Sequence, residues 1–215
     1  MSHDIRHVIT SALLLALFGV AGAGLVALVF DNTEERIEAN IRAQLLKSLN
    51  EIMPSERYDN DIANDTTQIW NADLNPGKGT TIYRARKNGK PVAAIFNITA
   101  AGGYGGPIRL LVGINHDGSL AGVRVVEQHE TPGLGDKIEP EKSDWLQGFV
   151  GKSLDNPNVQ NWKVKRDGGA FDQFTGATIT PRAVVKGIKN TLLYYSENSD
   201  AVFETLKPKE KQANE

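Results

Sequence analysis

The chain has 215 residues, a formal net charge of -2 and no cysteine. Its length allows one domain with a real hydrophobic core plus accessory segments. The near-neutral charge provides no basic face of the kind that nucleic-acid binding needs, so we expect no nucleic-acid partner. The absence of cysteine excludes disulfides, thiolate zinc sites, iron–sulfur clusters and cysteine nucleophiles, so redox chemistry would require a borrowed cofactor.

Residues 8–30 are an uncharged, mostly apolar stretch, VITSALLLALFGVAGAGLVALVF. As a helix this stretch would span roughly 34 Å, which is enough to cross a bilayer. A cleavable signal peptide is the alternative, but the stretch is longer than the usual apolar core of one. We therefore predict that residues 1–30 are a cytoplasmic stub and a single transmembrane helix in the lipid bilayer. Arg6 precedes the helix and acidic residues follow it, which favours a cytoplasmic N-terminus.

Residues 31–79 are expected to be a mainly helical connection. Asn32, with Glu35 three residues later, is typical of a helix start. Apolar side chains then recur at helical spacing, at Ile37, Ile41, Leu45, Leu49 and Ile52. Pro54 should end this helix.

Two hairpins are predicted next, in residues 80–99 and 108–128. Asn88-Gly89 and Asp117-Gly118 each separate two runs rich in β-forming residues, as in two-residue hairpin turns. These four strands begin a domain that we assign to residues 80–195. The fold class is α+β, with a mainly antiparallel sheet and flanking helices.

The C-terminal half is expected to be more irregular. Residues 136–151 resemble a short helical stretch, and NWKVKRD, residues 161–167, could add one more strand. A helix should start after Thr180, with Pro181 at its first position, where the missing N–H costs nothing. The charged tail, residues 196–215, is expected to fray.

Three glycine-rich segments lie outside the predicted strands and helices. They are AAGGYGGP at residues 100–107, QHETPGLGDKI at 128–138 and DQFTGATITP at 172–181. Loops on a rigid sheet often carry a protein's chemistry. In the third segment, Thr178 would lie near the positive end of the final helix, where an anion such as a phosphate ester is favoured. The alternative is that these threonines simply cap the helix.

The motifs DQFTGAT, GYGGPI and ETPGLGDKI together resemble a known family. It is the FMN-binding domain shared by the G subunit of Rnf electron-transport complexes and the C subunit of the sodium-pumping NADH:quinone reductase. The resemblance covers most of residues 80–195, and the modest length fits the Rnf protein better. It implies an electron-relay subunit of a ferredoxin/NAD-type, ion-translocating oxidoreductase in the bacterial inner membrane, with a periplasmic domain and other subunits as partners.

The resemblance also implies a site. A periplasmic flavin transferase would move FMN from FAD onto Thr178 as a covalent phosphoester, and it would recognise Asp172 together with Thr175. The remaining cofactor-binding residues that we expect are Gly176, Ala177, Thr180, Tyr104, Gly105, Glu130, Thr131, Pro132, Gly133, Leu134 and Gly135. No complete catalytic activity is expected from this chain alone.

Two other classes of function are weighed against this one. The chain could be an anchored assembly module without flavin, or the C subunit of the quinone reductase. The four histidines show no metal-ligand spacing, so no metal site is predicted, and no hydrolase arrangement is evident.

Overall fold

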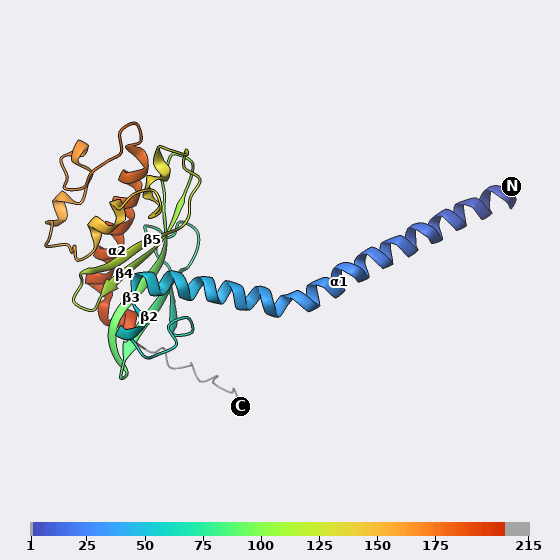
Figure 1. Cartoon of the computed structure of the whole chain (residues 1–215), viewed down its shortest axis with the longest axis horizontal. Helices are drawn as coiled ribbons and strands as arrows, with labels where there is room; N and C mark the ends of the chain where they lie inside the picture. Colours follow the sequence, from blue (N-terminus) through green and yellow to red (C-terminus); the bar gives the residue numbers. More distant parts are fainter. Residues whose placement is uncertain (1, 205–215) are drawn as a thin grey trace, which may run out of the picture. The chain divides into compact units, whose positions relative to one another are not determined.

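The computed structural model describes residues 2–204, which fall into two compact units divided after Leu45. Helix α1 is Ser2–Ile52 (Figure 1). The first unit is the part of this helix up to Leu45, and its last residues, 46–52, belong to the second unit. Within the described residues, α1 is the one helix long and apolar enough to cross a membrane. It contains the predicted span 8–30.

The prediction that a separate helix starts at Asn32 is wrong. The Asn32 side chain donates from Nδ2 to the Leu28 carbonyl oxygen at 2.7 Å, and the helix runs through it without a break. Here the amide bonds back to the preceding turn instead of capping a new one. The helix ends at Ile52, two residues before Pro54, as predicted.

The second unit is built on a five-stranded antiparallel sheet with its strands in chain order. The strands are β1 Thr66–Ile69, β2 Thr80–Lys87, β3 Lys90–Ala100, β4 Ile108–Asn115 and β5 Leu120–Glu127. The α+β class and the four predicted strands are confirmed. The fifth strand is β1, which lies in the segment expected to be helical.

The two hairpins turn differently. Asn88 and Gly89 both have positive φ, 51° and 73°, as a two-residue turn between β2 and β3 requires. Four residues, 116–119, separate β4 from β5; Asn115 N donates to Ser119 O at 2.8 Å, and Gly118 is the one residue among them with positive φ. The two-residue turn predicted at Asp117-Gly118 is therefore wrong.

Helix α2, Ile179–Phe203, packs along one face of the sheet against β3 and β4 (Figure 1). Its buried stripe contains Val184, Val185, Ile188 and Leu192, as the helical spacing predicted. At Gly187 a Cβ would lie 3.0 Å from the Ala100 Cβ, so glycine lets the helix approach β3 closely.

The C-terminal tail starts later than predicted. Helix α2 continues past Ser196 to Phe203, with a kink at Asn198, and Val202 is buried. Val202 and Phe203 are apolar, so this segment packs on the domain although its charged neighbours suggest a frayed tail. The rest of the predicted tail, 205–215, lies outside the described residues.

The opposite face of the sheet is covered in part by the end of α1. Leu49, Ile52 and Met53 are buried there. A Cβ at Gly113 of β4 would lie 2.3 Å from Ile52 Cγ2, so this glycine makes room for the helix end. The sheet therefore has apolar cover on both faces.

Between β5 and α2 the chain forms short 3-10 turns. They are η2 Gly135–Ile138, η3 Trp145–Phe149, η4 Val159–Asn161 and η5 Lys165–Asp167, and η1 Ser55–Arg57 follows α1. The predicted helical stretch 136–151 thus exists as η2 and η3. The strand predicted at 161–167 is wrong, because Val164 makes only an isolated bridge with Phe171. The ring of Phe171 is buried against that of Phe149, with centroids 4.6 Å apart, so the segment packs on an aromatic cluster and does not pair with the sheet.

Candidate functional site

A cavity of about 300 Å³ lies where the three glycine-rich segments meet. It is lined by Tyr104, Glu130, Thr131, Leu134, Gly135, Gly176, Ala177, Thr178, Ile179 and Thr180. All of these except Ile179 belong to the predicted set. The predicted residues Gly105, Pro132, Gly133, Thr175 and Asp172 belong to the same segments but are not among its lining residues.

Glu130 holds the three segments together. Its side chain is 5 % exposed, and its Oε1 accepts a hydrogen bond from Gly105 N at 3.0 Å. Its Oε2 accepts a hydrogen bond from the Thr180 hydroxyl at the start of α2. A charged acceptor strengthens both bonds. Each carboxylate oxygen therefore already has a partner in the protein, so the geometry makes Glu130 a positioning residue within the cavity wall.

Two glycines are required around this carboxylate. A Cβ at Gly105 would lie 1.8 Å from the His129 carbonyl oxygen, which is backbone and cannot move aside. A Cβ at Gly135 would lie 2.6 Å from both Glu130 Oε2 and Thr180 Oγ1. Gly105 of the GYGG motif and Gly135 of the PGLG motif are therefore explained by the close approach of the three segments.

Thr178 occupies the N-terminal end of α2, two residues earlier than the N-cap position that the sequence predicts. Helix α2 begins at Ile179, so Thr178 is the N-cap residue and Pro181 is the third helical residue, which corrects the predicted roles of Thr180 and Pro181. Thr178 has φ -80° and ψ -26°, and its side chain makes no capping hydrogen bond. Because the Thr180 hydroxyl is bound to Glu130, simple capping explains neither threonine.

The turn before Thr178 is closed by a hydrogen bond from Ala177 N to Phe174 O at 3.1 Å. Gly176 in this turn has φ 82°, which favours glycine. Trp145 supports the turn from behind. Its ring packs on Phe174 with centroids 5.3 Å apart, and its Nε1 donates to the carbonyl oxygen of Asp172 at 2.9 Å. The backbone that presents Thr178 is therefore fixed by packing as well as by the glycine.

A cation that the sequence reasoning missed contacts Thr178. The Arg166 guanidinium donates from Nη1 to Thr178 Oγ1 at 3.4 Å. The neighbouring Lys165 pairs with Asp172 at 2.6 Å, so the aspartate of the DQFTGAT motif is also held by this basic segment. The only signal in the sequence is the basic run KVKR, which lies within the segment predicted as a strand.

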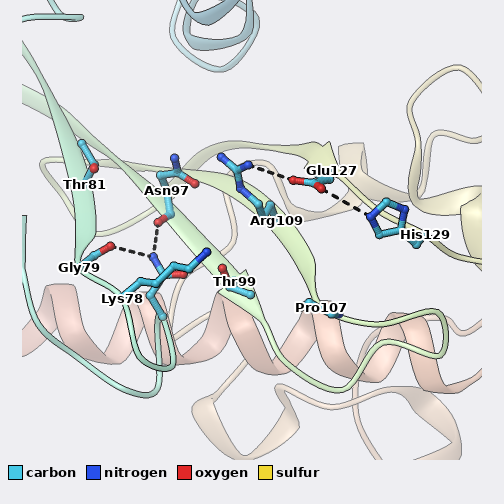
Figure 2. A pocket seen from close by; sticks show the side chains of 10 residues that line it. Lys78, Gly79, Thr81, Asn97, Thr99, Pro107, Arg109, Glu127 and His129 are labelled. Carbon is cyan, nitrogen blue, oxygen red and sulfur yellow. Dashed lines mark hydrogen bonds and ion pairs between the residues drawn. The ribbon is translucent and has the colours of Figure 1, made fainter. Parts of the chain in front are cut away.

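A larger cavity of about 420 Å³ lies over the polar ends of strands β2 to β5. Figure 2 shows its lining, in which Arg109 and Glu127 point toward each other across neighbouring strands. Arg109 Nη1 lies 2.9 Å from Glu127 Oε2, and His129 lies 3.5 Å from the other carboxylate oxygen. The hydrogen bond and charge of Arg109 hold the pKa of Glu127 below its ordinary value. These side chains pair with one another. Of the glycine-rich segments, only Pro107 and His129 line this cavity.

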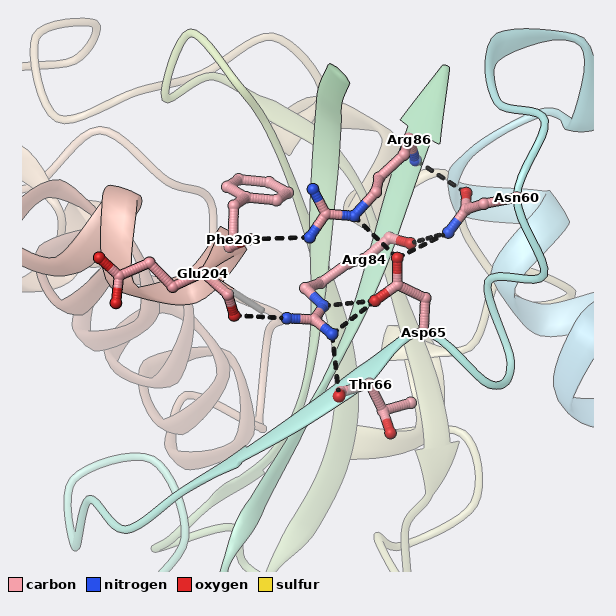
Figure 3. A network of polar contacts seen from close by, with 7 residues as sticks. All are labelled: Asn60, Asp65, Thr66, Arg84, Arg86, Phe203 and Glu204. Atoms are coloured by element: carbon pink, nitrogen blue, oxygen red, sulfur yellow. Dashed lines mark hydrogen bonds and ion pairs between the residues drawn. The ribbon is translucent and has the colours of Figure 1, made fainter. Parts of the chain in front are cut away.

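The far end of α2 is fixed by the arginine clamp, which we define as Asp65, Arg84 and Arg86 (Figure 3). Asp65 pairs with both arginines at 2.6 and 2.8 Å. Arg84 donates to the Glu204 carbonyl oxygen at 2.9 Å and Arg86 to that of Phe203 at 2.8 Å. Cations are favoured at the C-terminal carbonyls of a helix. The clamp thus fastens one end of α2 to β2 while Glu130 fastens the other end.

Two family models match this chain. Residues 103–193 match the FMN-binding domain, and residues 1–52 match the RnfG N-terminal region. The chain is 48 % identical over 194 residues to the G subunit of the ion-translocating oxidoreductase complex of Pseudoalteromonas atlantica, with 90 % of both chains covered. It is 48 % identical over 189 residues to that of Photorhabdus laumondii, with 88 % of both covered. It is 43 % identical over 192 residues to that of Vibrio atlanticus, with 89 % of this chain and 92 % of the relative covered. The resemblance in the three motifs is confirmed: the chain belongs to the RnfG family, the G subunits of ion-translocating oxidoreductase complexes.

Proposed function

We propose that this chain is the electron-relay subunit of a membrane-bound, ion-translocating oxidoreductase of the ferredoxin/NAD type, and that it carries FMN as a phosphoester on Thr178. Family membership and the match to the FMN-binding domain support an FMN-dependent electron-transfer subunit. When bound, FMN supplies reversible acceptance and release of electrons, which no side chain of this cysteine-free chain can supply. The other subunits would provide the remaining steps of the reaction.

The observation that carries the proposal is the position of the Thr178 hydroxyl. It lies at the wall of the cavity, at the first turn of α2, and it is not used for capping. The helix dipole and the backbone N–H groups of a first helical turn favour a phosphate group at this place. Because Thr180 is committed to Glu130, Thr178 is the hydroxyl of the pair that remains for an ester.

The cavity fits part of an FMN molecule. Its volume of about 300 Å³ is at the lower end of small-molecule sites, so a tethered FMN would remain partly outside it. The rim offers apolar side chains for a flat ring: Tyr104 is 72 % exposed, and Leu134 and Ile179 are also exposed. Partial exposure suits an electron relay, because redox partners must come close to the flavin.

The location in the cell is part of the proposal. Helix α1 would anchor the chain in the inner membrane as a single pass, with Arg6 on the cytoplasmic side and the sheet domain in the periplasm. A covalent bond makes sense there, since a dissociated flavin would be lost from the cell envelope. Protease added to spheroplasts should digest the sheet domain, whereas protection of that domain would reverse the orientation.

Maturation would require a periplasmic flavin transferase that uses FAD. Asp172, with 69 % of its side chain exposed, is accessible to such an enzyme, and Trp145 and Lys165 hold it in place. We therefore assign Asp172 and Thr175 to recognition by the transferase. Asp172→Asn should slow loading without changing the final product.

The test is the intact mass of the full-length chain, co-expressed with the transferase and purified in detergent. The expected mass exceeds that of the polypeptide by FMN less one water, and the denatured band should fluoresce yellow-green under ultraviolet light. Thr178→Val should abolish both signals and Thr178→Ser should keep them. Thr67→Val removes a hydroxyl of β1, outside this cavity, and should load normally. A wild-type chain with the bare polypeptide mass would instead indicate the flavin-free assembly module.

A further inference from the structure

Three cationic side chains lie in η5 and in the first turn of α2, the two helical elements nearest to Thr178 in the sequence. Lys165 and Arg166 belong to η5, and Arg182 lies in the first turns of α2. Judged by sequence distance alone, each of them could bind a phosphate on the Thr178 hydroxyl. Their ion-pair partners in the structure show which one is available.

Two of the three cations are already neutralised. Lys165 Nζ lies 2.6 Å from Asp172 Oδ1. Arg182 makes a two-pronged pair with Asp167, with Nε and Nη2 at 2.6 and 2.8 Å from its carboxylate oxygens. This pairing raises the pKa of Arg182 and lowers that of Asp167. A bidentate pair of this kind holds its arginine in one orientation.

Arg166 is the exception. In the described part of the chain its guanidinium makes no ion pair, and its hydrogen-bond acceptor is Thr178 Oγ1 at 3.4 Å. A guanidinium beside a neutral hydroxyl is poorly matched, because its charge and its fork of donors suit a phosphate. The same guanidinium would be well matched once Thr178 carried an ester.

The backbone directs Arg166 toward Thr178. Arg166 N donates to Gln173 Oε1 at 3.1 Å, and Lys165 N donates to Phe171 O at 2.7 Å, so η5 lies beside the DQFTGAT loop. The tight turn between them needs glycine, since a Cβ at Gly169 would lie 2.0 Å from the Lys163 carbonyl oxygen. The main chain at Arg166 is thus held in place by Gln173, a residue of the motif other than Thr178 itself.

We propose that Arg166 is the phosphate-binding residue of this site, and that it acts both while FMN is attached and afterwards. The inference rests on the proposed ester at Thr178. In the attachment step Thr178 Oγ forms a bond to the FMN phosphorus of FAD, the bond from that phosphorus to the AMP oxygen breaks, and AMP leaves. The hydroxyl proton passes to a base of the transferase, and no atom is oxidised or reduced. Arg166 orients the hydroxyl and balances the negative charge of the phosphoryl group that it receives.

The test is a time course of loading, followed by intact mass, with purified full-length chain, the transferase and FAD. Arg166→Ala should load more slowly, on the order of tenfold, which is the usual value of a hydrogen bond to a charged group. Arg166→Lys keeps the charge and should recover part of the rate. Lys163→Ala removes an equal charge from an exposed residue two positions before η5 and should load like the wild type. The defect should shrink in high salt.

A second readout concerns the loaded protein. Loading should raise the Tm of the wild type more than that of Arg166→Ala, because only the wild type gains the contact between guanidinium and phosphate. Equal unloaded Tm values would show that the variant is folded. If Arg166→Ala loads at the wild-type rate and its Tm rises by the same amount on loading, the proposal for Arg166 fails, while the proposed ester at Thr178 is unaffected. If the wild type never gains the mass of FMN, the proposed ester itself fails and Arg166 has no phosphate to bind.

Discussion

Replacing Glu130 with alanine should cost more stability than the loss of any exposed carboxylate in this chain. The substitution leaves the Gly105 N–H and the Thr180 hydroxyl without their acceptor in a site where Glu130 is 5 % exposed. A buried group left unsatisfied costs about 1–3 kcal/mol, and this cost applies in full to the Thr180 hydroxyl and in part to the Gly105 N–H, whose bond is only part-buried, so we expect a total of about 3 kcal/mol. For a domain of this size that corresponds to a decrease in Tm of about 6–12 °C.

The assay is thermal unfolding of the flavin-free chain, with Thr178→Val as the common background so that loading does not alter stability. Glu127→Ala is the matched control, because Glu127 is a carboxylate at the end of β5, just before the same loop, but pairs with Arg109 at the surface. Its Tm should change little, since exposed ion pairs contribute little. Glu130→Gln, which keeps one acceptor oxygen, should fall between the two. If Glu130→Ala and Glu127→Ala unfold at the same temperature, Glu130 does not hold the three segments together.

Three further changes test other parts of the structure. Gly105→Ala should prevent the GYGG loop from closing, because the new Cβ would meet the His129 carbonyl, and FMN loading measured by intact mass should fall even where the circular dichroism spectrum is unchanged. Asp65→Ala leaves the two nearly buried guanidiniums of the arginine clamp without their carboxylate, and should lower the free energy of unfolding in urea by about 3 kcal/mol. The hydrogen bond from Lys142 lowers the pKa of Asp136, so its stabilisation is present above the ordinary aspartate pKa and is lost as pH falls through the folded value. Acid unfolding of Asp136→Asn should therefore depend less steeply on pH below about 4 than that of the wild type.

Most residues that line the cavity could be predicted from the sequence because the information is local. Glycine density, the order of the three motifs and the apolar spacing of α2 can each be read within a short window. The order of the strands explains why the loops then meet. Strands β3 and β5 flank β4 and run in the same direction, so the loops after Ala100 and Glu127 leave the sheet at the same end of the strands.

The errors have a different origin. Asn32 carries a cap-forming side chain, but the continuing helix offers it the Leu28 carbonyl, so a local preference was satisfied in another way. The segment around Val164 has strand-like residues, but it makes only an isolated bridge with Phe171 and packs on aromatic rings instead of pairing with the sheet. The contact of Arg166 with Thr178, 12 residues apart, depends on how a turn and the Gln173 side chain bring η5 back onto the motif, and no residue pattern in the sequence displays that geometry.

The structure separates the parts of this site that must be rigid from those that must be reached. Glu130 and the glycines around it are buried or closely packed, and they fix the start of α2 against the two loops. Thr178 and Tyr104 lie at the accessible side of the same cavity. In the proposed function, a hydroxyl that a transferase modifies and a flavin that exchanges electrons with other subunits would both need access from outside. Because the buried carboxylate holds the backbone, that access does not require a flexible loop, and the phosphate would arrive at donors that are already in position.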